Sequence, residues 1–412
     1  MIKFHQHQLN NGLRLLVHED STVPTAVMNI LYDVGSRDEQ EEKTGFAHLF
    51  EHLMFGGSKN VASYDHELQK VGGSNNAFTS PDITNYYITL PSNNLETAFW
   101  LESDRMMHLL LNPKALEVQR KVVIEEFKQR YLNQPYGDVW LHFRPLCYQV
   151  HPYKWQTIGK DISHIEQASL EDVKDFFDKY YCPNNAILVV AGNVDTTEVI
   201  HLTEKWFGDI PQGNVPKRNL PQEPEQTSAR FLQIEANVPT SMIYKAYHTC
   251  QRNHPDYYAT DLLSDLLGRS KSSRLFETLV KEKKIFSSIS AYISGSIDTG
   301  IFTISGKVNK GVSLEEADAE IVKVIEELQT NNPPQERELQ KIKNQAETIL
   351  LMSEMEVLNR AMNLAYSALL GDADLINKEG EQIQSVTTSK VHEIAKKILR
   401  PEKCSTLYYK AK

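Results

Sequence analysis

Apolar and polar residues follow two different spacings along the chain, and each spacing predicts a type of element. Residues 13–34 contain two apolar stretches around a polar turn, which predicts a β-hairpin. The apolar run at 186–195 predicts a buried strand, and a helix is expected over about 196–206. Apolar residues recur at helical spacing in four further segments, near 44–56, 63–71, 93–110 and 114–132.

The second half of the chain repeats this order of elements. A strand pair at 230–237 and 241–249 precedes two helical segments, near 255–267 and 272–283. Strands are expected at about 285–307, followed by three long helical patterns between 313 and 399. Both halves end with a helix, a proline turn and an apolar strand.

This repetition predicts an α+β protein of two similar domains, each a mostly antiparallel sheet packed with helices. The segment rich in Pro, Gly, Gln and charged residues is the best candidate for a linker. We therefore expect an N-terminal domain at 1–210, a linker at 211–228 and a C-terminal domain at 229–412.

Composition narrows the class of protein further. With 41% hydrophobic and 24% charged residues, the chain is typical of globular proteins, and its net charge of −10 gives no basic footprint for nucleic acid. Its four scattered cysteines indicate neither a disulfide framework nor a cysteine-based zinc site. No signal peptide and no membrane-spanning run is visible. We expect a cytoplasmic protein, or a periplasmic one if a leader has been removed.

One predicted helix carries a pattern of metal-binding residues. Thr44 is its expected N-cap, and Gly56 and Gly57 its expected end. On a helical wheel, the apolar side chains share one face: Phe46, Leu49, Phe50, Leu53 and Met54. The opposite face carries three polar side chains: His48, Glu51 and His52. Two imidazoles one turn apart beside a carboxylate suit a zinc ion, although a solvated polar face is the alternative.

A hydrolytic zinc site needs a third protein ligand and an open position for water. The helix that Asn112 and Pro113 begin is the expected source. On its wheel, Glu126 flanks the apolar stripe, whereas Glu125 points to solvent. We therefore expect Glu126 to be the third ligand; the alternative is that both glutamates lie on an exposed face.

The chain resembles the pitrilysin family of zinc metallopeptidases, which carry an inverted H-x-x-E-H motif and are also called inverzincins. The resemblance rests on HLFEH (48–52) and on the glutamate that follows it in QRKVVIEEF (119–127). The similarity covers nearly the whole chain, and the chain is similar to the two-domain subunits of mitochondrial processing peptidase and its bacterial relatives. Four further stretches are similar to the family: GGSNNAFTSPDITNYY (72–87), HPYKWQTIG (151–159), YYCPNNAILVVAGNVD (180–195) and LLSDLLGRSKSSRLFETL (262–279).

The resemblance implies a role for each matching residue. His48, His52 and Glu126 would bind Zn²⁺, and Glu51 would be the general base that activates water. The chain would then be a zinc-dependent endopeptidase subunit that hydrolyses peptides or unfolded polypeptides. Many relatives carry a second glutamate seven residues before the third ligand, but this chain has Gln119 there.

Two further implications concern substrate and partner. Asn76 and Ala77 match the strand edge to which relatives add the substrate backbone. Self-sufficient relatives also carry an Arg and a Tyr that help to hold the substrate carbonyl, whereas this chain has Val280 and Ser287. We therefore expect a heterodimer with a homologous subunit that supplies the Arg/Tyr pair. The alternative is a homodimer in which another residue of this chain, such as Arg274, replaces the pair.

Two other functions fit the same fold. The chain could be a non-catalytic scaffold, or a peptide-binding subunit that uses the edge strand without turnover. The complete H-x-x-E-H motif with Glu126 argues against a scaffold, which has no need of a metal site.

Overall fold

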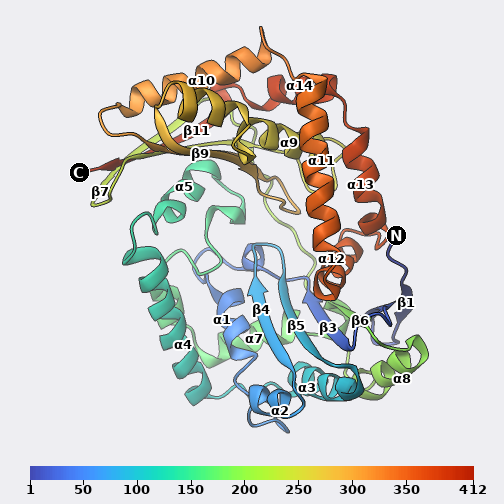
Figure 1. The fold of residues 1–412 in the computed structure, drawn as a ribbon. Coiled ribbons are helices and arrows are strands. Elements are labelled where there is room, and N and C mark those ends of the chain that lie inside the picture. Colours follow the sequence, from blue (N-terminus) through green and yellow to red (C-terminus); the bar gives the residue numbers. More distant parts are fainter. The chain divides into compact units, whose positions relative to one another are not determined.

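The computed structural model describes residues 1–412, which form two compact units. Each unit is built around one β-sheet with helices on its faces (Figure 1). The expected α+β architecture is therefore confirmed. Both units are discontinuous in sequence: unit 1 contains Met1–Arg130, Trp155–Leu220 and Leu351–Lys378, and unit 2 contains Tyr131–Lys154, Pro221–Leu350 and Glu379–Lys412. The limits expected for two consecutive domains stay a prediction.

The sheet of unit 1 has six strands in the order β1-β2-β6-β3-β5-β4. Its strands are β1 (His5–Gln8), β2 (Arg14–Glu19), β3 (Thr25–Tyr32), β4 (Ser74–Thr79), β5 (Thr84–Pro91) and β6 (Ala186–Gly192). Strands β2 and β6 run parallel, and the other neighbours are antiparallel. Strand β4 forms one edge of this sheet, with no strand beyond it.

The hairpin expected over residues 13–34 is wrong. Its two strands, β2 and β3, do not pair with each other, because β6 lies between them. Every residue of β6 is buried, and a strand that is apolar on both faces is most stable in the interior of a sheet. The same correction applies to the strand pair expected in the second half.

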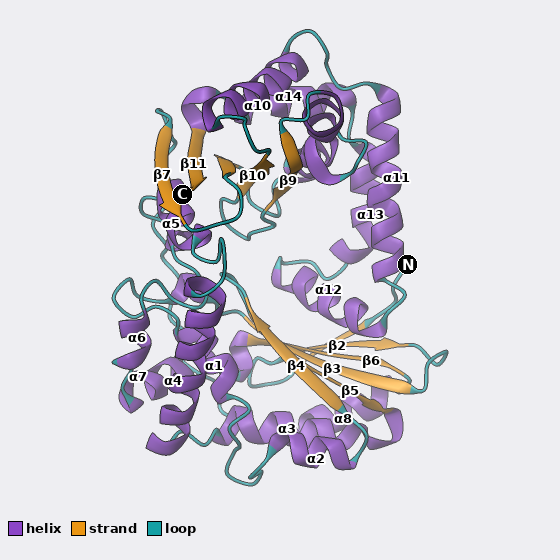
Figure 2. Cartoon of the chain, turned by 60° about the vertical axis from the view of Figure 1, so that its left-hand side comes forward, coloured by secondary structure: helices purple, strands orange, loops and turns teal.

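The helices of unit 1 cover both faces of its sheet. Figure 2 shows α2, α3 and α8 on one side of the strands and α12 on the other. Their bounds are α1 (Phe46–Leu53), α2 (Tyr64–Lys70), α3 (Leu95–His108), α4 (Pro113–Phe127), α6 (Ile162–Glu166), α7 (Leu170–Tyr180), α8 (Thr196–Phe207) and α12 (Val357–Leu369).

Unit 2 repeats the sheet of unit 1 without the outer strand β1. Its order is β7-β11-β8-β10-β9, with β7 and β11 parallel and the other neighbours antiparallel. The strands are β7 (Arg230–Ala236), β8 (Met242–His248), β9 (Phe286–Ile293), β10 (Ile301–Val308) and β11 (Cys404–Ala411). The expected similarity of the two halves is therefore confirmed.

The helical patterns between 313 and 399 form five helices and not the expected three. They are α10 (Leu314–Gln329), α11 (Glu336–Ser353), α12 (Val357–Leu369), α13 (Leu375–Ser385) and α14 (Thr388–Ile398). Pro333 and Pro334 separate the first two, since proline cannot continue a helix. Earlier in the chain, α9 (Tyr257–Ser264) continues into a π-helical segment, Asp265–Arg269, and a second such segment is Phe276–Glu282.

In each unit, one face of the sheet is covered by a helix that comes from the other half of the chain. Helix α12 packs on β2, β3 and β6 of unit 1 through Ala361, Leu364 and Ala365. Helix α5 (Val139–Cys147) packs on β7, β8 and β11 of unit 2 through Val139 and Phe143. This exchange explains why neither unit is continuous in sequence.

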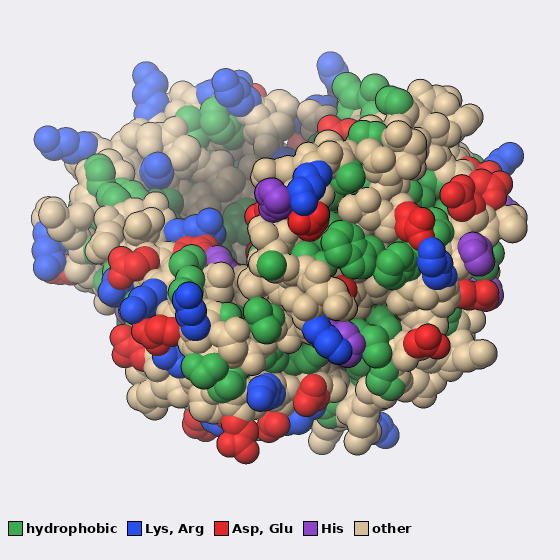
Figure 3. Space-filling model, turned by 90° about the horizontal axis from the view of Figure 1, so that it is seen from below, with side chains coloured by type: hydrophobic (Ala, Val, Ile, Leu, Met, Phe, Trp, Pro, Cys, Tyr) green, Lys and Arg blue, Asp and Glu red, His purple; other side chains and the backbone are tan.

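None of the helices combines the length and apolar character needed to cross a bilayer. Acidic and basic side chains are interspersed over the face shown in Figure 3. This face has no extended patch of positive charge.

Candidate metal centre

Helix α1 has the two faces expected from its sequence. Phe46, Leu49, Phe50 and Leu53 are buried, whereas His48, Glu51 and His52 are partly exposed. The rings of the two histidines lie edge to face, with their centroids 4.8 Å apart. The one-turn spacing therefore places both imidazoles on the same side of the helix.

The expected N-cap of α1 is wrong. The helix begins after Gly45, and the Thr44 hydroxyl accepts a hydrogen bond from the Lys160 N–H instead. The Glu39 carboxylate binds the helix terminus, with its Oε2 2.9 Å from Gly45 N and its Oε1 2.8 Å from Ala47 N. Gly45 has φ +89°, and a Cβ there would lie 2.7 Å from Ile158 O, so glycine is required.

Glu39 was not found by sequence reasoning. Its side chain is buried, and burial raises the pKa of the carboxyl well above its usual range. The two backbone N–H groups oppose that rise, because a carboxylate is stabilised at a helix N-terminus. Glu39 thereby orients the helix that carries the candidate metal ligands.

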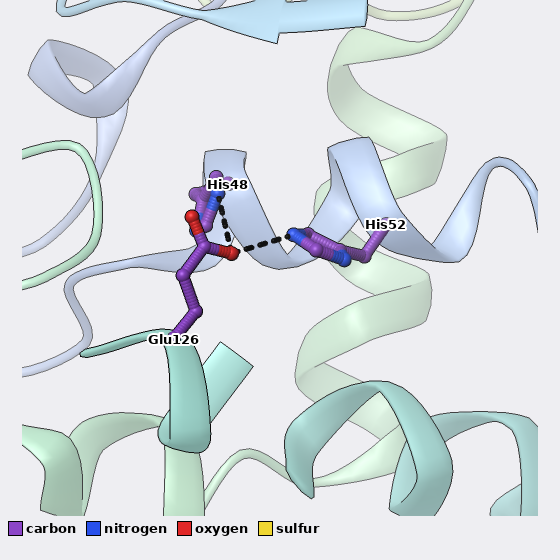
Figure 4. A group of neighbouring side chains, drawn as sticks. All are labelled: His48, His52 and Glu126. Atoms are coloured by element: carbon purple, nitrogen blue, oxygen red, sulfur yellow. Dashed lines mark ion pairs between the residues drawn. The ribbon is translucent and has the colours of Figure 1, made fainter. Parts of the chain in front are cut away.

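Helix α4 begins as expected, with the Asn112 side chain accepting a hydrogen bond from Ala115 N and Pro113 at its first position. Glu125 is exposed and pairs with Lys128. Glu126 instead extends towards the histidines of α1 (Figure 4). The structure thus brings together His48, His52 and Glu126, and leaves Glu125 outside the group.

The three side chains converge on one point. Oε2 of Glu126 lies 3.3 Å from Nε2 of His52 and 3.7 Å from Nε2 of His48. Their ligand atoms all lie within 4.8 Å of one another. Atoms bound tetrahedrally at zinc distances are separated by about 3.3–3.6 Å, so small side-chain movements suffice to bind an ion. Two nitrogens and one oxygen also leave a fourth position for water.

The electrostatics of the group fit a metal site. Burial, followed by the neighbouring His52, lowers the pKa of His48 to about 4, so its imidazole is neutral near pH 7. The neutral ring is the form that binds a metal. A hydrogen bond from His52 lowers the pKa of Glu126 and favours its carboxylate. The buried Nδ1 of His48 has no hydrogen-bond partner, so only the opposite edge of the ring, which carries Nε2, faces a polar group, Glu126.

Arg130 and Thr79 complete the surroundings. Nη1 of Arg130 lies 2.8 Å from Oε1 of Glu126, which leaves Oε2 directed at the histidines. The Thr79 hydroxyl donates to Oε2 of Glu51 at 2.6 Å. Burial raises the pKa of Glu51, and the bond from Thr79 opposes that rise. Arg130 follows Glu126 by one helical turn, so spacing could have indicated it, whereas Thr79 has no such signal.

The expected substrate-binding residues lie on the edge strand β4. Asn76 is exposed, and its Oδ1 accepts a hydrogen bond from the Ala77 N–H at 2.9 Å. This N–H is therefore bonded to a side chain that a substrate carbonyl could replace. Val280 packs partly against the core of unit 2, and Ser287 is exposed on β9.

Two family profiles match the chain. "Insulinase (Peptidase family M16)" matches residues 14–138, and "Peptidase M16 inactive domain" matches residues 167–346. The zinc protease PqqE of Helicobacter pylori is 34% identical over 343 residues, which cover 81% of this chain and 76% of that protein. The chain belongs to peptidase family M16. This result confirms the resemblance to pitrilysin-type zinc proteases.

Other M16 proteins are similar over much of the chain. The probable mitochondrial-processing peptidase subunit beta of Schizosaccharomyces pombe is 27% identical over 72% of this chain and 67% of its own length. The crystal structure of a protease from Helicobacter pylori superposes with a TM-score of 0.93 at 29% identity and covers 100% of both chains. The chain is therefore similar to a solved protease structure over its full length and to a named zinc protease over 81% of it.

Proposed function

We propose that this chain is the zinc-binding subunit of an endopeptidase that cuts peptides or unfolded polypeptides. The observation that carries the proposal is the convergence of Glu126 with His48 and His52, with Glu51 on the same helix. Relatives that bear the name zinc protease support the choice of metal. Zinc bound by His48, His52 and Glu126 would acidify a water and polarise the scissile carbonyl.

The chain's own groups suit the proton transfers of peptide hydrolysis. Glu51 is half-buried, and only its Oε2 receives the bond from Thr79. Its Oε1 is then the atom that takes the proton of the attacking water and passes it to the leaving amine. A half-buried carboxyl with a raised pKa is suited to both steps.

Substrate would add to the free edge of β4 as an extra strand. The Ala77 N–H would donate to a substrate carbonyl in place of Asn76 Oδ1. Pairing through the backbone accepts many sequences but needs an extended chain. Unfolded polypeptides should therefore be cut, and stable folded domains spared.

A partner would supply what unit 2 lacks. Val280 and Ser287 stand where self-sufficient relatives have the Arg and Tyr, and neither side chain can donate comparably to a carbonyl oxygen. Arg274 is engaged elsewhere, because its guanidinium binds Glu338 and the carbonyls of Asn332 and Pro333. These contacts favour a heterodimer over a homodimer that relies on Arg274.

The test combines metal analysis with cleavage of an unstructured peptide. The purified chain, alone and mixed with any similar-sized M16 subunit that is encoded next to it, should bind about one zinc per chain. Glu51→Gln should keep zinc and lose turnover by about 10²–10⁴-fold, since general-base catalysis contributes that much. A chain without zinc would support a scaffold. Zinc and peptide binding without turnover in the mixture would support a peptide-binding subunit.

A further inference from the structure

Two side chains of strand β4 form hydrogen bonds to helices α1 and α2. Thr79, at the end of the strand, donates its hydroxyl to Glu51 in α1. Four residues earlier, Nδ2 of Asn75 donates to Oδ1 of Asp65 in α2 at 2.8 Å. Positions 75, 77 and 79 point to the same side of a strand, so these two bonds hold one face of β4.

The bond from Thr79 is well placed to control the conformation of Glu51. It joins Oγ1 of Thr79 to Oε2 of Glu51 at 2.6 Å, the short distance typical of a hydroxyl bonded to a carboxylate. A glutamate side chain has three rotatable bonds and loses conformational entropy when it is held in place. Holding one oxygen before substrate arrives removes that cost from the reaction itself.

The backbone of Thr79 belongs to the same strand as the proposed docking edge. Ala77 pairs with Tyr86 of β5 on one side, and the other side of β4 has no strand partner. Thr79 pairs with Thr84 in the same ladder. The distance between the docking edge and the carboxylate is therefore set by one continuous strand and one hydrogen bond.

We propose that Thr79 is a positioning residue that fixes the Glu51 carboxylate relative to the substrate-pairing edge of β4. This inference rests on the proposed peptidase function and deepens it. Thr79 does not touch the reacting atoms. It acts by keeping Oε1 of Glu51 directed at the position where the attacking water must lose its proton.

Three variants of the full-length chain, assayed with its partner subunit, test this role. Thr79→Val keeps the shape of the side chain and removes the donor, whereas Thr79→Ser keeps the donor. Thr89→Val, on the neighbouring strand β5, is the matched control. Thr79→Val should lower kcat by about 10–100-fold with KM within about twofold, because a misplacement near 1 Å can cost about 10²-fold. Thr79→Ser should recover most of kcat, and zinc content should not change.

Crystal structures of the wild type and both Thr79 variants give a readout that does not depend on activity. The Glu51 carboxylate should move in Thr79→Val and stay in Thr79→Ser. An unchanged kcat in Thr79→Val, or an equal loss in Thr79→Ser, would overturn the positioning role. If the wild-type mixture cuts no peptide and the carboxylate still moves only in Thr79→Val, the peptidase proposal fails while the positioning of Glu51 stands.

Discussion

Units 1 and 2 share a sheet topology but differ in one helix, which follows β3 along the chain in unit 1 and β8 in unit 2. In unit 1 this helix is α1, whose exposed face carries His48, Glu51 and His52. In unit 2 it is α9 with its π-helical extension, which carries Asp261 and Asp265. Asp265 pairs with Arg269 at 2.9 Å, so its charge is balanced within the helix. The two units therefore share a fold, but only unit 1 carries the two histidines and the glutamate on this helix.

The two units also differ in how this helical segment contacts the edge strand of the sheet, which is β4 in unit 1 and β9 in unit 2. In unit 2, Gly268 lies so close to β9 that a Cβ would be 2.1 Å from Ala291 N. In unit 1, side chains meet between α1 and β4, where the Thr79 hydroxyl donates to the Glu51 carboxylate. Backbone that approaches this closely leaves no room for a side chain at Gly268, whereas α1 and β4 of unit 1 leave room for Glu51 and Thr79.

The sharpest test of this comparison is the metal content of paired variants. Glu126→Gln should abolish zinc binding and, with it, all peptidase activity, because a neutral amide is a poor zinc ligand. Glu125→Gln should leave both unchanged, since Glu125 is exposed and pairs with Lys128. Asp265→Asn in unit 2 should also keep zinc. Atomic absorption of the purified variants measures this, and a reversed result for the two glutamates would refute the assignment.

The second test asks whether another chain completes unit 2. Mixing with the partner subunit should raise kcat/KM by about 10²–10³-fold, the usual effect of one oxyanion donor. Mutating the partner's Tyr to Phe should remove most of that gain. Full activity of this chain alone would instead show that Val280 and Ser287 impose no defect.

A third test separates the acidic residues of α9 from catalysis. Burial, followed by the nearby Asp265, raises the pKa of Asp261 to about 6. A carboxyl with a raised folded-state pKa favours folding below about pH 4, and that contribution is lost as pH rises through the folded value. We therefore compare the free energy of unfolding of Asp261→Asn with that of the wild type at each pH. The variant's gain over the wild type should be larger at pH 8 than at pH 4 by about 1–3 kcal/mol. Urea denaturation at both pH values measures this, and turnover should not change.

The smallest effect is expected at the edge of β4. Ala77→Pro removes the N–H that now bonds to Asn76, a position where an edge strand tolerates proline. Loss of one hydrogen bond to substrate, worth about 1 kcal/mol, should raise KM about fivefold with little change in kcat. Peptide kinetics measure the split between the two constants. An unchanged KM would mean that substrate does not pair with this edge.

Local spacing was sufficient to predict which side chains of α1 and α4 face one another. The wheel of α1 separates the histidines from Phe46 and Leu49, and the wheel of α4 separates Glu126 from Glu125. These inferences succeeded because helical periodicity relates residues only one or two turns apart. Asn112 and Pro113 marked the start of α4 for the same reason.

Long-range contacts decided the rest of the molecule. The position of β6 between β2 and β3, and the packing of α5 and α12 on the sheets of unit 2 and unit 1, join segments far apart in the chain. Glu39 and Thr79 likewise reach α1 from segments whose own spacing does not indicate the contact. Sequence periodicity determines which face of an element is apolar, but not which distant surface it will cover. That choice depends on how all the apolar faces can be buried at once, so only the tertiary structure decided the sheet order and the surroundings of Glu51.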